Sequence, residues 1–222
     1  MLVYGLVLVL SILKYKYYYE TRLKAFPILI AYILLTEIFG GLIRNIDEIQ
    51  IVFEADYQNH NHLIYNILDI ISFLYFFYIY HGSTTNLKLK KQIKWAAILF
   101  CMASVINQFF ENFTIQPQLI VILTGSVALL FFAAMYLRET SKMRIAFSNY
   151  HKLLQWISIG LLSFYPFYPF IIGIGQVNEE LYNKMYLYKF LLVLITVMYG
   201  CFIVGLIRLG RIPSNTKTKK VL

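Results

Sequence analysis

Long apolar stretches alternate with four blocks of lysine and arginine along this chain of 222 residues. The blocks hold 17 of the 20 Lys and Arg residues: Lys14, Lys16, Arg22 and Lys24; Lys88, Lys90, Lys91 and Lys94; Arg138, Lys142, Arg144 and Lys152; and Arg208, Arg211, Lys217, Lys219 and Lys220. Most acidic residues lie in the intervening connections. Because cytoplasmic loops of membrane proteins collect cations, the blocks predict which ends of the apolar stretches face inward.

The composition excludes an ordinary soluble domain. Apolar residues make up 59% of the chain and charged residues 14%, whereas soluble domains average about 25% charged residues. The net charge of +9 is divided among four separated loops, so anionic lipid of the inner leaflet is a better counter-charge than nucleic acid. The abundance of Lys, Ile, Asn, Tyr and Phe is typical of an AT-rich bacterial genome. We therefore expect a multi-pass protein of the inner (plasma) membrane.

Seven stretches are close to the ~20 residues that cross ~30 Å of hydrocarbon as a helix. They are residues 2–19, 25–43, 63–81, 95–111, 119–137, 153–174 and 187–207. Since lipid forbids unpaired backbone groups, we expect an all-α transmembrane bundle over residues 1–209 and a basic cytoplasmic tail over 210–222. An odd number of crossings places the N-terminus outside and the C-terminus inside, with every basic block on the cytoplasmic side. Whether the first span crosses completely stays open.

Two ionisable residues lie within these spans, where such groups are costly and usually functional. Glu37 is six residues before the outer end of the second span, and Asp69 is six residues after the outer start of the third. Each therefore lies roughly 9 Å below the outer interface. We expect the two carboxyl groups to share a depth on adjacent helices.

Small and polar residues share helix faces with these carboxyl groups. Gly40, Gly41 and Arg44 share the face of Glu37 on the second span, and His62 and Asn66 share that of Asp69 on the third. The fourth span adds Ser104, Asn107, Gln108 and Glu111. All are in the outer half of the predicted bundle. The pattern favours a polar cavity that faces outward.

A proline-rich aromatic segment, residues 165–169, interrupts the sixth span at a comparable level. Pro166 and Pro169 are the candidate hinge residues, because proline removes a helical hydrogen bond. The candidate ligand-binding or proton-binding residues are Glu37, Arg44, Asn66, Asp69, Asn107, Gln108, Tyr165 and Lys189. A structural alternative stays open, in which Arg44 neutralises Glu37, Asn66 satisfies Asp69 and the glycines permit close packing.

The chain lacks the common catalytic motifs, including H-E-x-x-H, G-x-S-x-G and the P-loop. We therefore expect no enzymatic activity and no cofactor. His60 and His62 lie near Glu54 and Asp56 and are the candidate metal ligands. Because an H-x-H in a polar loop is more often solvated than coordinated, no metal site is predicted. Both cysteines fall within spans and are predicted to be small core residues.

Two segments resemble known membrane proteins. Pro117-Gln118 resembles the dipeptide of the seven-helix PQ-loop and sugar-efflux carriers, although the first span lacks the matching dipeptide that their repeat requires. Tyr65-Asn66-Ile67 and Trp156-Ile157-Ser158-Ile159-Gly160-Leu161-Leu162 resemble an uncharacterised bacterial family of small seven-helix integral membrane proteins, which is similar to the membrane input modules of sensor kinases. The second resemblance implies a sensory or regulatory role.

Three functional hypotheses follow. In the first, the protein is a non-enzymatic sensory or regulatory module that signals from an outer polar cavity to a cytoplasmic or membrane partner. In the second, it is a small secondary transporter, proton-coupled or facilitative, in which Glu37 or Asp69 binds the coupling proton. In the third, it is a structural subunit of a membrane complex.

Overall fold

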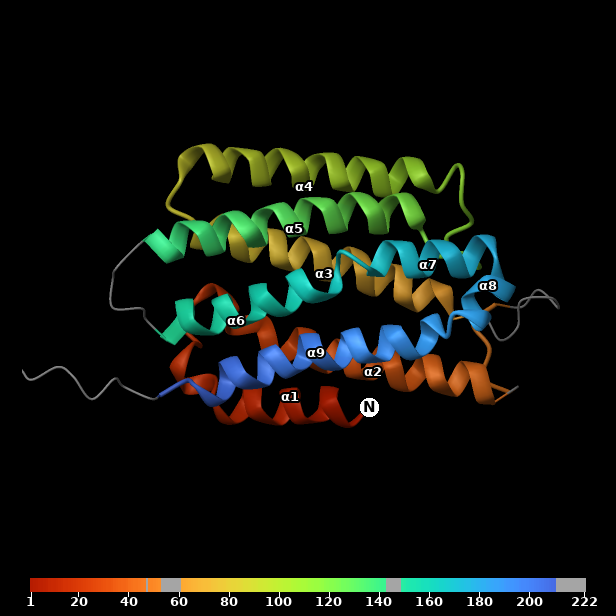
Figure 1. Ribbon diagram of the computed structural model, residues 1–222, viewed down its shortest axis with the longest axis horizontal. Coiled ribbons are helices and arrows are strands. Elements are labelled where there is room, and N and C mark those ends of the chain that lie inside the picture. Colours follow the sequence, from red (N-terminus) through yellow and green to blue (C-terminus); the bar gives the residue numbers. More distant parts are fainter. Residues whose placement is uncertain (47, 53–60, 143–148, 211–222) are drawn as a thin grey trace, which may run out of the picture.

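The computed structural model describes residues 1–46, 48–52, 61–142 and 149–210. Within these ranges every regular element is a helix. Figure 1 shows the long helices lying side by side along the longest axis of the molecule, from α4 and α5 at the top to α2 and α1 at the bottom. The predicted all-α membrane architecture is confirmed at this level.

The helices follow the apolar stretches of the sequence. They are α1 (Leu2–Leu13), α2 (Phe26–Asn45), α3 (His62–Ser83), α4 (Leu87–Asn107), α5 (Leu119–Lys142), α6 (Asn149–Phe164), α7 (Tyr168–Val177), α8 (Glu179–Lys184) and α9 (Leu187–Ile207), with short 3-10 turns at Tyr15–Tyr17 and Arg22–Ala25. In the described part of the chain, five segments are long and apolar enough to cross a membrane: Arg22–Asn45, His62–Ser83, Leu119–Ser141, Asn149–Val177 and Leu187–Ile207. They correspond to the second, third, fifth, sixth and seventh predicted spans.

Helices α1 and α4 differ from their predicted spans. Helix α1 has 12 residues, about 18 Å of rise, because the chain leaves the α-helix at Lys14 and continues in a 3-10 turn. Helix α4 starts eight residues before the predicted residue 95, since the Asn86 side chain accepts hydrogen bonds from the backbone N–H groups of Lys88 and Leu89 and caps it. Its first two turns consequently carry four lysines.

The described parts of the four basic blocks lie at one end of the bundle, on the left of Figure 1. Helices α1, α3, α5 and α9 end there, and α2, α4 and α6 begin there. We call this the basic end. Helices α2, α4 and α7 end at the opposite end, where α3, α5 and α9 begin.

Aromatic rings join the helices in the core. The fully buried Phe73 of α3 packs its ring 5.4 Å from that of Phe100 on α4 and 5.2 Å from that of Tyr165. Phe77 meets Phe132 of α5 edge-on at 5.6 Å, an arrangement that aromatic pairs prefer. Many apolar side chains face outward instead, among them Ile28 at 71% exposure, as expected where hydrocarbon is the solvent. Cys101 is exposed on α4, so its predicted place in the core is wrong.

Glycines bring α6 and α9 into close contact. A Cβ atom added to Gly160 of α6 would lie 2.7 Å from the carbonyl oxygen of Met198, and one added to Gly205 of α9 would lie 2.8 Å from Cβ of Trp156. Small residues allow backbones to approach in this way in membrane bundles. Helix α6, the first part of the sixth predicted span, is thus held against α9.

We expect Gly160→Ala to destabilise the protein by about 1–3 kcal/mol, because the new methyl group meets backbone that has little room to move. Thermal unfolding in detergent measures the effect. Gly200→Ala is the matched control, since a Cβ atom at Gly200 of α9 would meet nothing within 4 Å. Equal unfolding midpoints for the two variants would contradict the packing described here.

Candidate functional site

A hydrogen bond links Asp69 to the break in the sixth span. The hydroxyl of Tyr168 donates to Oδ2 of Asp69 over 3.0 Å, across the interface between α3 and α7. Helix α6 ends at Phe164 and α7 begins at Tyr168, so the predicted interruption is present. Pro169 occupies the first turn of α7. Backbone N–H groups in the first turn have no partner within the helix, so the N–H that proline lacks is not needed there. The carboxyl group is therefore tied to the residue that restarts the helix.

Glu37 on α2 is partly buried and accepts two phenolic hydrogen bonds. Tyr4 of α1 donates to Oε1 and Tyr65 of α3 donates to Oε2, each over 3.4 Å. Both bonds are long and correspondingly weak. Arg44 is exposed near the end of α2 and forms no ion pair with Glu37 in the described structure. The carboxyl group of Glu37 is thus hydrogen-bonded by phenols and is not paired with Arg44.

Tyrosines lie beside both carboxyl groups. The rings of Tyr165 and Tyr168 meet edge-on at 6.0 Å on the Asp69 side, and Tyr65, which donates to Glu37, is one helical turn from Asp69 on α3. The rings of Tyr4 and Tyr199 meet edge-on at 4.7 Å. We call the set Glu37, Asp69, Tyr4, Tyr65, Tyr165, Tyr168 and Tyr199 the tyrosine–carboxyl cluster. It joins α1, α2, α3, α7 and α9 inside the bundle.

Gly40 makes room for one of these phenols. A Cβ atom at Gly40 would lie 2.6 Å from the hydroxyl of Tyr65, which itself reaches Glu37. Asn61 donates its side-chain N–H to the carbonyl of Gly40 over 3.0 Å. A Cβ atom at Gly41, by contrast, would meet nothing within 4 Å. Only the first glycine of the pair is required by the cluster.

Asn66 belongs to a different polar group. Its Nδ2 donates to the carbonyls of Phe113 and Gln116 over 2.7 and 2.8 Å, and its Oδ1 accepts from the backbone N–H of Gln118 over 3.2 Å. These bonds hold the α4–α5 connection against α3. The structure therefore assigns Asn66 a loop-clamping role, and its bonds do not reach Asp69.

Asn107 strengthens the same connection from α4. Its Nδ2 donates to Oε2 of Glu111 and to Oε1 of Gln118, both over 2.7 Å. Gln118 is the second residue of the Pro-Gln dipeptide, so in this structure that dipeptide takes part in a loop clamp. Gln108 is exposed at the end of α4. These residues lie outside the tyrosine–carboxyl cluster.

The other predicted residues lie apart. Lys189 is exposed on α9, with its Nζ 4.7 Å from the ring centre of Tyr186. His62 opens α3, whereas His60, Glu54 and Asp56 lie outside the described residues. Within the described ranges no group of three His, Cys, Asp or Glu side chains could hold a metal ion.

Sequence reasoning found both carboxyl groups and Tyr165 but missed most of the tyrosines that join them. With 19 tyrosines in the chain, the residue type alone selects none. The spacing of Tyr65 and Asp69, four residues apart on one helical face, was the available signal. Tyr168 is 99 residues from Asp69, so no local pattern could have paired them.

A scan against protein-family models found no match, and searches of curated proteins and of solved structures found no similar chain. The resemblance to seven-helix input modules of sensor kinases therefore stays a prediction.

We expect Asn66→Ala to loosen the α4–α5 connection, because it removes three hydrogen bonds and leaves two carbonyls and one N–H without their partner. A loss of about 1–3 kcal/mol is typical for an unsatisfied buried group. Hydrogen–deuterium exchange over residues 108–118 should become faster. Gln108→Ala is the control, since that side chain is exposed beside the same connection. Unchanged exchange in Asn66→Ala would show that the clamp does not hold the loop.

Proposed function

We propose that this chain is a non-enzymatic sensory or regulatory membrane protein, which transmits a change at the tyrosine–carboxyl cluster to its basic end. The observation that carries the proposal is the hydrogen bond between Asp69 and Tyr168. A ligand or proton that alters Asp69 acts directly on the residue that restarts the broken helix. Conformational coupling needs such a differential contact between a site and a movable element.

Helix α6 provides the path to the basic end. It ends four residues before Tyr168, and its first residue, Asn149, lies at the basic end. Pro166 lies in the break and Pro169 in the first turn of α7. Proline-interrupted membrane helices deform where neighbouring groups satisfy the freed backbone. The close α6–α9 contact at Gly160 then makes the two helices respond together. The basic end is the surface that we propose contacts a cytoplasmic or membrane partner.

The proposed topology has seven transmembrane helices, with the N-terminus outside and the C-terminus in the cytoplasm of a bacterial cell. Its support is the basic end, which by the positive-inside rule faces the cytoplasm. Helix α4 counts as a crossing because Leu99 and Val105, beyond its lysines, are each 61% exposed. Helix α1 likewise exposes Leu6 and Val9 at 50% and 54%.

Under this topology the cluster lies in the outer half of the membrane. Glu37 is eight residues before the end of α2 at Asn45, and Asp69 is seven residues after the start of α3 at His62. Both are therefore about 11 Å along the helices from the ends that would face outward. A signal from the outside reaches them before it reaches the basic end.

A proton-coupled carrier is the second candidate, favoured by the presence of two carboxyl groups inside the bundle with phenolic partners. Intramembrane carboxyl groups of this kind form proton relays in transporters. The two functions differ in one property: a carrier moves its substrate or proton when purified alone, whereas a regulatory module needs its partner.

We expect Tyr168→Phe to loosen the helix break while preserving the fold. Losing one hydrogen bond to a carboxyl group should make amide exchange of the first turn of α7 about tenfold faster, and the effect should extend into α6. Hydrogen–deuterium exchange in lipid nanodiscs measures both. Tyr165→Phe is the matched control, because it removes a neighbouring phenol that forms no hydrogen bond in the described structure. Equal exchange in the two variants would remove the basis for coupling.

Cross-linking and purification from native membranes test the regulatory role itself. We expect a stoichiometric partner whose yield changes in Tyr168→Phe but not in Tyr165→Phe. If both variants are expressed normally and the unmodified protein still purifies without any partner, the result counts against the proposal.

Proteoliposomes test the carrier alternative. With a pH-sensitive dye inside and an imposed potential, we expect the unmodified protein and Asp69→Asn to show the same proton leak. A proton flux that Asp69→Asn abolishes and that Gln108→Ala retains would replace the regulatory proposal with the carrier.

A further inference from the structure

A polar hollow of about 450 Å3 lies between the start of α6 and the end of α9, and its walls are Lys152, Gln155, Trp156 and Arg208. The two cations come from different basic blocks, which the fold brings together from positions far apart in the sequence. Among the residues that the structure describes, no acidic side chain lines the hollow. Its volume is within the range of small-molecule sites. We call it the α6–α9 hollow.

The walls of the hollow are held in place. The Arg208 guanidinium lies 4.7 Å from the ring centre of Trp156, in the position of a cation–π contact. Trp156 in turn packs on Gly205, where an added Cβ atom would lie 2.8 Å from the Cβ of the tryptophan. Leu209 is buried, and its carbonyl accepts a hydrogen bond from Nζ of Lys14 over 3.4 Å. The end of α9 that presents Arg208 is thus fixed from both sides.

The hollow also lies at the level expected of lipid headgroups. Arg208 directly follows Ile207, the last residue of one membrane-crossing segment, and Lys152 is in the first turn of another. Tryptophan is enriched at this interface, with its ring beside the carbonyl and glycerol region of the lipid. Two cations, an amide and an indole at this depth match the chemistry of a phospholipid phosphate and its glycerol.

We propose that the α6–α9 hollow binds the phosphate group of an anionic phospholipid. Lys152 and Arg208 pair with the phosphodiester, Gln155 hydrogen-bonds to it or to a headgroup hydroxyl, and Trp156 packs against the glycerol carbons. Arg208 keeps its guanidinium plane on the indole while its N–H groups point to the phosphate, which is the arrangement that favours arginine over lysine at such sites. The proposal does not depend on the Asp69–Tyr168 coupling.

A second hollow at the basic end fits this chemistry less well. It has a volume of about 490 Å3 and contains Arg22 and Lys24, but Glu20 forms part of its wall. Arg22 already donates to the hydroxyl of Tyr78 over 3.0 Å. A carboxylate in the wall repels a phosphate, so the α6–α9 hollow is the better anion site.

Tryptophan quenching by brominated lipid tests the proposal on the full chain. In a Trp95→Phe background Trp156 is the only tryptophan, so its fluorescence reports the lipid next to the hollow. The protein is reconstituted into vesicles that contain either brominated phosphatidylglycerol or brominated phosphatidylcholine as the minor component. We expect phosphatidylglycerol to quench preferentially. Lys152→Gln and Arg208→Gln should each lower that preference by about fivefold.

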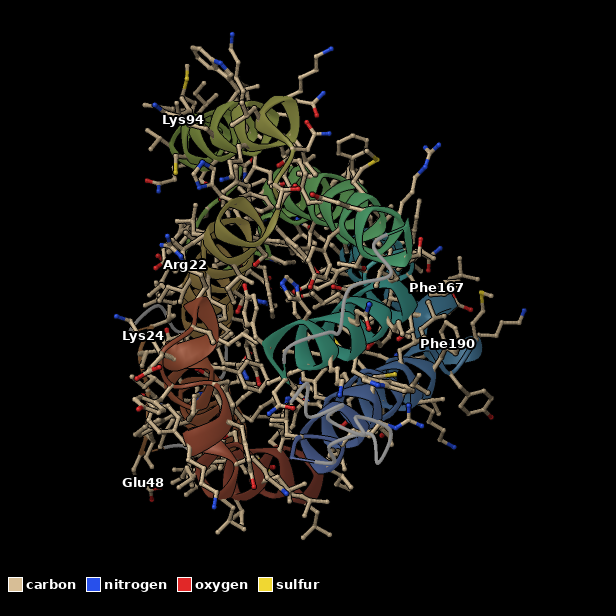
Figure 2. All side chains as sticks on the ribbon, turned by 90° about the vertical axis from the view of Figure 1, so that its left-hand side faces the viewer. Arg22, Lys24, Glu48, Lys94, Phe167 and Phe190 are labelled. Carbon is tan, nitrogen blue, oxygen red and sulfur yellow. The ribbon has the colours of Figure 1, made fainter. Side chains whose placement is uncertain are left out.

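Lys94→Gln is the matched control. It removes one cation from the same end of the bundle, but Figure 2 shows Lys94 on α4, on the opposite side from α9. The preference should be retained in this variant. Circular dichroism checks that each variant folds. Because Lys152 and Arg208 lie on separate helices, the second variant still tests the site if the first does not fold.

Inorganic phosphate separates a lipid site from a site for a soluble phosphate. We expect excess phosphate to leave the quenching preference unchanged. A preference that phosphate abolishes would overturn the lipid assignment in favour of a soluble anion. Equal quenching by the two lipids, or an equal loss in Lys94→Gln and Arg208→Gln, would overturn the site.

Discussion

Inside hydrocarbon, a polar side chain must find its partners within the protein, and in this bundle tyrosine hydroxyls supply many of them. A phenol can cross a helix interface that a shorter side chain cannot span, so each such bond also ties two elements together. Tyr168 reaches Asp69, Tyr80 meets Ser158 over 2.7 Å between α3 and α6, and Tyr136 meets His151 over 2.8 Å between α5 and α6. The hydroxyl groups thus link the helices at several depths, while the rings of the same residues fill the core.

These phenols depend on glycines that leave space for them. Gly40 allows the Tyr65 hydroxyl to reach Glu37, and Gly160 allows α6 to lie directly on the backbone of α9. A larger residue at either glycine would move a helix that carries a hydrogen-bonding side chain. The hydrogen bonds of buried polar groups in this fold therefore depend on the close packing of the helices. A Cβ atom at Gly41 or Gly200 would meet nothing within 4 Å, so the packing does not require glycine at these two positions.

The distribution of cations predicted the helical bundle and its basic end, because charge and hydropathy act locally along the chain. Helix ends were harder to predict. Asn86 extends α4 backward by capping it, a short-range interaction that the search for apolar runs ignored. Hydrogen-bond partners on different helices were the hardest to predict, because residues such as Asp69 and Tyr168 are distant in sequence. The shared helical face of Asn66 and Asp69 suggested that the two side chains bind together. Asn66 instead clamps the α4–α5 connection, since a residue near a helix end can face a neighbouring loop.

Helix α6 connects the two proposed sites. Just beyond its end at Phe164, Tyr168 of α7 contacts Asp69, and near its start α6 supplies Lys152, Gln155 and Trp156 to the α6–α9 hollow. Arg208, the remaining wall of that hollow, belongs to the end of α9. Because α6 and α9 are packed together at Gly160 and Gly205, a movement at the proline break would shift both walls of the hollow together relative to the lipid headgroups. Because linkage is reciprocal, a lipid that binds one arrangement of α6 and α9 better than another would also bias the state of the tyrosine–carboxyl cluster. The composition of the inner leaflet would then set the sensitivity of the outer site.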